Sequence, residues 1–175
     1  MTLLESLLRY WLRWPGVERL IHDHLWVWGV CQSVHFAGMA LLIGTVGMLD
    51  LRLLGLAKDL PIAPLKRLVP WGVLGFALCL VTGVVFVTGM YANVNIHPYV
   101  VLTSDVFLQL KLLFVMLAGL NLLAFYVTGM SRAVDRLGAG DAAPPMAKVI
   151  AGLSLCLWIG VMYFARLIPS GKFQP

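Results

Sequence analysis

The stretch that decides the fold runs from Leu25 to Leu49 and reads LWVWGVCQSVHFAGMALLIGTVGML. It contains no Asp, Glu, Lys or Arg, and it exceeds the roughly 20 apolar residues that a helix needs to cross a bilayer. Because lipid offers the backbone no hydrogen-bond partner, a run of this length must pair its own peptide groups as an α-helix. The stretch therefore predicts a transmembrane helix.

Three more apolar runs follow, at about Trp71–Tyr91, Leu102–Val127 and Val149–Ile168. The third run is interrupted by Asp105 and Lys111. Four spans with short connections are typical of an up-down bundle in which neighbouring helices are antiparallel. We therefore predict an all-α fold, an integral membrane four-helix bundle.

The composition favours the same class of protein. Hydrophobic residues make up 61% of the 175 residues and charged residues 12%, against roughly 25% charged in soluble domains. The net charge of +5 comes from short segments between apolar runs and forms no basic stripe, which excludes a nucleic-acid partner. We expect residues 25–169 to form the bundle in a lipid bilayer, and residues 170–175 to form a tail.

Residues 1–24 have a different pattern. Leu3, Leu7 and Trp11 recur at helical spacing, while Arg9 lies off that stripe. This pattern predicts an amphipathic helix that lies in the membrane interface.

The distribution of Lys and Arg predicts the topology, because basic residues favour the cytoplasmic side. The loops after the first and third spans hold seven of them: Arg52, Lys58, Lys66, Arg67, Arg132, Arg136 and Lys148. The other side, which includes both ends of the chain, holds five: Arg9, Arg13, Arg19, Arg166 and Lys172. Both termini are therefore expected outside. The stretch 138–145, GAGDAAPP, is expected to be a flexible connection on the inside.

Two ionisable side chains inside the predicted spans are candidate site residues, since such groups are costly in a membrane. His35 lies about 15 Å into the first span and Lys111 about 14 Å into the third, at 1.5 Å per residue. Both spans run in the same direction, so the two side chains are expected at one depth. An imidazole and a neutral amine can both ligate iron, and Gly38 and Gly119 would leave room for a porphyrin edge.

Plainer interpretations of these residues stay open. Lys111 can extend to the headgroups or pair with Asp105, and His35 can hydrogen-bond a neighbouring helix. Glycines also allow helices to approach closely. Asp50 and Arg52 are expected to form an ion-pair network with Arg67, and Asn121 is expected to bond across the bundle.

A second set of candidate ligands overlaps the first. Cys31, His35 and Met39 lie on one stripe of the first span, and thiolate, imidazole and thioether together suit Cu(I). Met116 and Met162 lie at comparable depth, and either is an alternative axial partner of His35. Methionine and cysteine are also common core residues.

The sequence also resembles a known family. Ser33–Gly38, Leu42–Gly44 and Leu49–Gly55 are similar to motifs of an uncharacterised family of small four-helix bacterial membrane proteins. The resemblance covers about residues 30–125, and Asp-Leu-Arg-Leu-Leu-Gly at 50–55 is its most specific part. Further matches are Pro70, Gly75-Phe76, Thr82-Gly83, Lys111-Leu112 and Asn121. The resemblance implies a multi-pass protein of the bacterial inner membrane.

More distantly, the layout is similar to two better-described families. One is the membrane domain of copper-resistance protein D, which implies copper traffic. The other is the J-type protoporphyrinogen oxidase, a four-helix protein that binds haem b. Its proposed ligands, a histidine of the first helix and a lysine of the third, correspond to His35 and Lys111. The tryptophan- and proline-arginine-containing signature of that oxidase does not follow His35. The resemblance therefore implies haem binding but does not extend to tetrapyrrole oxidation.

Three hypotheses follow. The first is a haem b protein that transfers electrons between a periplasmic partner or quinone and the membrane pool. The second is a copper-binding or transport protein that uses Cys31, His35 and Met39. The third is a cofactor-free anchor or structural subunit. Whether the chain is an oxidoreductase subunit, and whether it forms a homo-oligomer, stay open.

Overall fold

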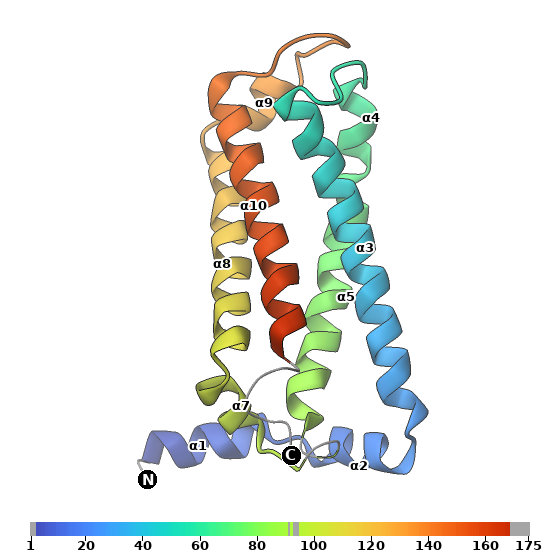
Figure 1. Ribbon diagram of the computed structural model, residues 1–175, viewed down its shortest axis with the longest axis vertical. Coiled ribbons are helices and arrows are strands. Elements are labelled where there is room, and N and C mark those ends of the chain that lie inside the picture. Colours follow the sequence, from blue (N-terminus) through green and yellow to red (C-terminus); the bar gives the residue numbers. More distant parts are fainter. Residues whose placement is uncertain (1–2, 91, 93–94, 169–175) are drawn as a thin grey trace.

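Four long helices stand side by side and two short ones lie across one end of them in the computed structural model, which describes residues 3–90, 92 and 95–168 (Figure 1). The helices are α1 Leu3–Leu12, α2 Pro15–Asp23, α3 Trp26–Leu54, α4 Ile62–Arg67, α5 Val69–Thr88, α7 Pro98–Ser104, α8 Val106–Val127, α9 Met130–Val134 and α10 Pro145–Leu167.

The predicted membrane bundle is confirmed. Among the described residues, four helical stretches are long and apolar enough to cross a membrane: α3, α4 with α5, α8 and α10. Many of their large apolar side chains are exposed, as lipid-facing surfaces require, and the predicted N-terminal helix is present as α1. The expected tail, 170–175, and Tyr91 lie outside the described residues.

The predicted start of the third span, near Leu102, was wrong. The chain breaks at Asp105, which ends α7 and begins α8. Its Oδ1 accepts hydrogen bonds from the backbone N–H groups of Phe107 and Leu108, at 2.9 and 3.0 Å. These two amides have no partner within their own helix, and the carboxylate satisfies them at the N-cap position. A charge inside an apolar run thus marks a helix boundary.

The long helices form two antiparallel pairs. α3 packs along α5, α8 packs along α10, and α10 also packs on α3. Gly75 lets α5 approach α3, because a Cβ atom there would lie 2.6 Å from the carbonyl oxygen of Gly38. The two glycines face each other, so the close crossing depends on both.

The end of the bundle that carries the basic loops holds the buried apolar core. Its members come from α3, α4, α8, α9, the loop before α10, and α10: Leu53, Ile62, Phe125, Val134, Ala143, Ala147, Ile150 and Ala151. The two helix pairs are therefore joined most firmly at this end.

Arg52 lies at the same end and is completely buried, with an exposed fraction of 0%. Its Nε donates to the carbonyl oxygen of Leu60 at 2.6 Å, and its Nη1 and Nη2 donate to those of Asp141 and Gly138 at 3.1 and 2.8 Å. We call Arg52 and these three carbonyl groups the Arg52 network. It joins the loop after α3 to the loop before α10.

Two sequence predictions fail here. Arg52 binds carbonyl groups and no carboxylate, Asp50 instead hydrogen-bonds Ser154 on α10, and Arg67 is exposed. The stretch 138–145, which was expected to be flexible, is fixed by hydrogen bonds. Besides its two bonds to Arg52, its Gly140 N–H donates to the Lys58 carbonyl at 2.9 Å. The planar guanidinium, with five N–H donors, can serve several carbonyls at once.

α1 and α2 lie across the other end of the bundle (Figure 1). α1 contacts α7, and α2 contacts α3 and α5. The side chain of Ile21 on α2 is buried against Gly89, just after α5. This layer is where an interfacial helix is expected to lie.

Replacing Arg52 with Gln should destabilise the protein by about 2–3 kcal/mol, because buried carbonyl groups would lose charged donors. Thermal unfolding in a mild detergent measures the effect. Arg67→Gln removes the same charge from an exposed site on the same side and should change stability little. Equal loss of stability in the two variants would contradict the assigned role of the Arg52 network.

Gly75→Ala should destabilise the α3–α5 crossing by about 1–3 kcal/mol, the usual cost of forcing extra atoms into a packed contact. Gly83→Ala is the matched control on the same helix, because a Cβ atom at Gly83 would meet nothing within 4 Å. Unfolding of both variants in the same detergent tests the prediction, which fails if Gly75→Ala is as stable as Gly83→Ala.

Candidate functional site

His35 is the tenth residue of α3 and is buried between α3 and α5, with an exposed fraction of 8%. Its Nδ1 lies 2.7 Å from Oγ1 of Thr82 on α5. Its ring lies against that of Phe86, with centroids 5.2 Å apart. The imidazole is therefore held by a polar contact and an aromatic contact from the same helix.

The hydrogen bonds of Thr82 fix the tautomer of a neutral His35. The Thr82 hydroxyl donates its proton to the carbonyl oxygen of Leu78, at 2.6 Å. A hydroxyl has one proton to give, so its oxygen accepts from His35, and Nδ1 carries the ring hydrogen. Nε2 is then left with a free electron pair. Histidines that bind metals use the same arrangement, with one nitrogen donating to a protein acceptor and the other on the metal.

Lys111 is the sixth residue of α8 and is half-buried. It lies within electrostatic range of both the His35 imidazole and the Cys79 thiol. Among the residues that the structure describes, no acceptor forms a hydrogen bond with its Nζ. An amine without an acceptor among apolar helices is costly, which marks Lys111 as a site candidate.

His35 and Lys111 lie within electrostatic range of each other, although the helix lengths used to predict a common depth were not right. His35 lies about 14 Å from the start of α3 and Lys111 about 8 Å from the start of α8, at 1.5 Å per residue. The difference arises because α7 occupies the layer beneath α8 (Figure 1). The alternative pairing of Lys111 with Asp105 is not observed, since Asp105 caps α8.

Two neighbours of His35 were missed by sequence reasoning. Besides Thr82, Cys79 lies beside the histidine and donates from Sγ to the His35 carbonyl oxygen, at 3.5 Å. A thiol and a hydroxyl three residues apart fall on one face of a helix, and that spacing is the signal that would have found them. Asn121, by contrast, bonds across the bundle as expected, from Nδ2 to the Ile150 carbonyl at 3.0 Å.

The proposed sulfur ligands are less enclosed than His35. Cys31 and Met39 lie one turn before and one turn after it and are half-buried. Met116 and Met162 are exposed, at 57% and 36%. No group of three or more His, Cys, Asp or Glu suited to a metal ion occurs within 3–90, 92 and 95–168. Copper ligation by these residues stays a prediction.

The two glycines expected beside a porphyrin occupy different environments. The space beside Gly38 is filled by the Gly75 carbonyl and the side chains of Leu78 and Cys79. Gly119 lies on the exposed face of α8, whereas Ala118 faces inward and is buried. Their contribution to a cofactor site stays a prediction.

No known protein family matches the sequence, and no curated protein or solved structure matches it either. Functional inference therefore depends on the geometry of His35, Thr82 and Lys111.

Thr82→Val should remove the acceptor of the His35 Nδ1–H group and release its tautomer, at a cost of about 1–3 kcal/mol for the unpaired donor. Thr82→Ser keeps the hydroxyl and should preserve the tautomer. Nitrogen-15 NMR of histidine-labelled protein distinguishes protonated from bare ring nitrogens. A proton on Nε2 of His35 in the unmodified protein would contradict the assignment.

Proposed function

We propose that this protein is a membrane haem b protein, with His35 and Lys111 as the axial ligands and electron transfer as its role. The observation that carries the proposal is the 2.7 Å contact between His35 Nδ1 and the Thr82 hydroxyl. Because that hydroxyl donates to Leu78, we infer that Nδ1 carries the ring hydrogen and that the electron pair of Nε2 is available. Haem iron is commonly held by such a nitrogen.

The environment of Lys111 supports the second ligand. An amine ligates a metal only in its deprotonated form, and metal binding favours that form. The absence of a described acceptor for Nζ, together with the apolar helices around it, agrees with a neutral amine. When bound, haem supplies reversible one-electron chemistry, which is the cofactor's own.

The remaining tasks belong to the protein chain. Thr82 orients the imidazole of His35, Phe86 restricts its rotation, and the apolar helices keep water away. The distribution of basic residues supports an orientation with both termini outside, in the bacterial inner membrane. A periplasmic partner or a quinone would then exchange electrons at the end of the bundle that carries α1.

An absorption spectrum of protein expressed with ample haem tests the proposal. A Soret band, with α and β bands that sharpen on reduction, is expected. His35→Ala removes a proposed ligand itself, so the haem content should fall by more than roughly tenfold, the smallest loss usually seen when only the hydrogen-bond partner of a ligand is removed. Lys111→Ala should abolish the low-spin spectrum. His97→Ala and Lys148→Ala, which remove the same residue types outside the proposed site, should leave the spectrum unchanged.

Other outcomes would replace the proposal. A His35→Ala spectrum identical to that of the unmodified protein would exclude His35 as a ligand. If Lys111→Ala alone kept the low-spin spectrum, Met116 or Met162 would be the partner of His35. A colourless protein with bound copper that Cys31→Ser removes would favour the copper hypothesis with Cys31, His35 and Met39. A colourless, metal-free protein would favour a structural anchor.

A further inference from the structure

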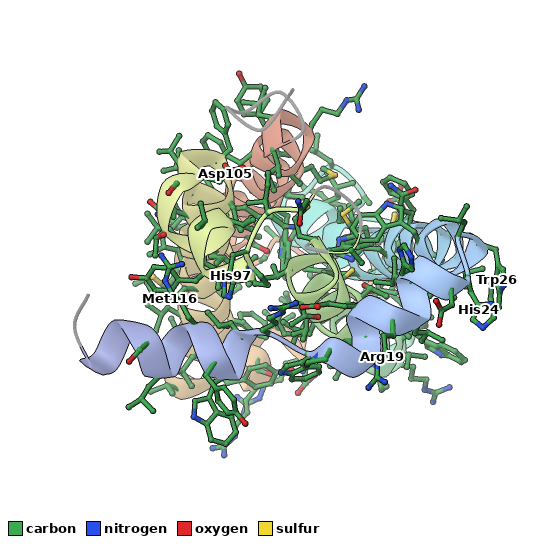
Figure 2. All side chains as sticks on the ribbon, turned by 90° about the horizontal axis from the view of Figure 1, so that it is seen from below. Arg19, His24, Trp26, His97, Asp105 and Met116 are labelled. Carbon is green, nitrogen blue, oxygen red and sulfur yellow. The ribbon has the colours of Figure 1, made fainter. Side chains whose placement is uncertain are left out.

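A hollow of about 600 Å³ lies at the end of the bundle, where the C-terminal half of α1 and the turn into α2 pass His97. Figure 2 shows His97 beside α1. The volume is within the range of small-molecule sites, roughly 300–1,000 Å³. The side chains that line the hollow are basic or aromatic, apart from one proline: Arg9, Tyr10, Trp11, Arg13, Trp14 and His97.

Arg9 is held at the hollow by the start of α7. Its guanidinium carbon lies 4.7 Å from the centre of the Tyr99 ring. The positive charge thus lies over an aromatic face, a cation–π contact that holds the guanidinium at the edge of the hollow.

Arg13 is oriented by α2. Its Nε and Nη2 donate to the carboxylate of Glu18, at 3.1–3.2 Å. This pairing fixes the orientation of the guanidinium, which carries five N–H donors in a rigid fork. Two cationic groups thus line one hollow.

His97 adds a third donor. Its Nδ1 accepts the backbone N–H of Tyr99 at 3.1 Å, as the N-cap of α7. Burial, and then the positive charges of Arg9 and Arg13, lower the pKa of His97, with Glu18 opposing them. The ring is therefore neutral at neutral pH, and its single hydrogen is on Nε2. Arg9, Arg13 and His97 Nε2 all donate, which suits a ligand made of acceptor oxygens.

The surroundings identify the source of such a ligand. Tyr10 and Trp11 line the hollow and are 77% and 71% exposed. Tyr and Trp are enriched at the level of lipid headgroups. α1 lies across the end of the bundle (Figure 1), where the long apolar helices are expected to leave the membrane. The oxygen-rich anion present at this depth is the phosphate of a phospholipid, which guanidinium groups bind with paired hydrogen bonds.

We propose that this hollow binds the phosphate of an anionic phospholipid headgroup through Arg9, Arg13 and His97. The bound lipid would connect α1 and α7 through one shared anion. This site is separate from His35 and Lys111, so it can exist whether or not the protein binds haem.

Native mass spectrometry of the full chain, released from nanodiscs, tests the proposal. Nanodiscs of phosphatidylcholine with a minor fraction of phosphatidylglycerol provide both lipids at once. We expect selective retention of phosphatidylglycerol, reduced about fivefold by Arg9→Gln or Arg13→Gln, since one arginine near a membrane surface contributes roughly 1 kcal/mol toward anionic lipid. The matched control is Arg19→Gln, on α2 and away from His97 (Figure 2), whose side chain bonds to Pro15.

Three results would overturn the proposal. Equal retention of the two lipids by the unmodified protein would exclude an anionic headgroup, and this comparison needs no variant to fold. An equal loss in Arg19→Gln would assign the selectivity to diffuse surface charge. Complete displacement of phosphatidylglycerol by excess inorganic phosphate, with phosphate retained in its place, would assign the hollow to a soluble anion. His97→Gln, which keeps a donor and both arginines, should reduce retention less than Arg9→Gln.

Discussion

A bilayer gives polar groups no hydrogen-bond partner, and the structure follows from how each buried polar group meets that constraint. The Arg52 network satisfies a guanidinium with three loop carbonyls. Asp105 satisfies the first amides of α8, and Asn121 bonds to α10. Each of these sets of hydrogen bonds also joins two segments of the chain, so it stabilises the fold while it satisfies a buried polar group. Lys111 differs from these residues, because no described acceptor reaches its Nζ, and for that reason it is a candidate ligand.

Most of the fold could be predicted from the sequence, because hydrophobic length alone identifies a membrane-spanning helix. The local polar contacts could not. Asp105 reads as an interruption of a span, and only the backbone geometry shows that it begins a helix. Arg52 was expected to form an ion pair, but it binds three carbonyl groups, two of which lie more than 80 residues away in the sequence. Composition carries no information about such distant backbone groups, so the stretch 138–145 was expected to be flexible and proved to be held.

At the candidate site too, some residues could be predicted from the sequence and others could not. An ionisable residue in an apolar run is visible in the sequence, which is why His35 and Lys111 were identified. Thr82 and Cys79 were not, since small polar residues in a span usually serve helix packing. The state of His35 depends on Thr82, whose proton goes to Leu78. His97 has the opposite tautomer, because its Nδ1 accepts a backbone N–H. The hydrogen of the neutral ring is therefore on Nδ1 in His35 and on Nε2 in His97.

The position of the Arg52 network has a mechanical consequence. It joins the two helix pairs at the end where the buried apolar core lies. The pairs cannot separate at that end without breaking charged hydrogen bonds as well as apolar contacts, so this end is expected to be the last part of the bundle to open on unfolding.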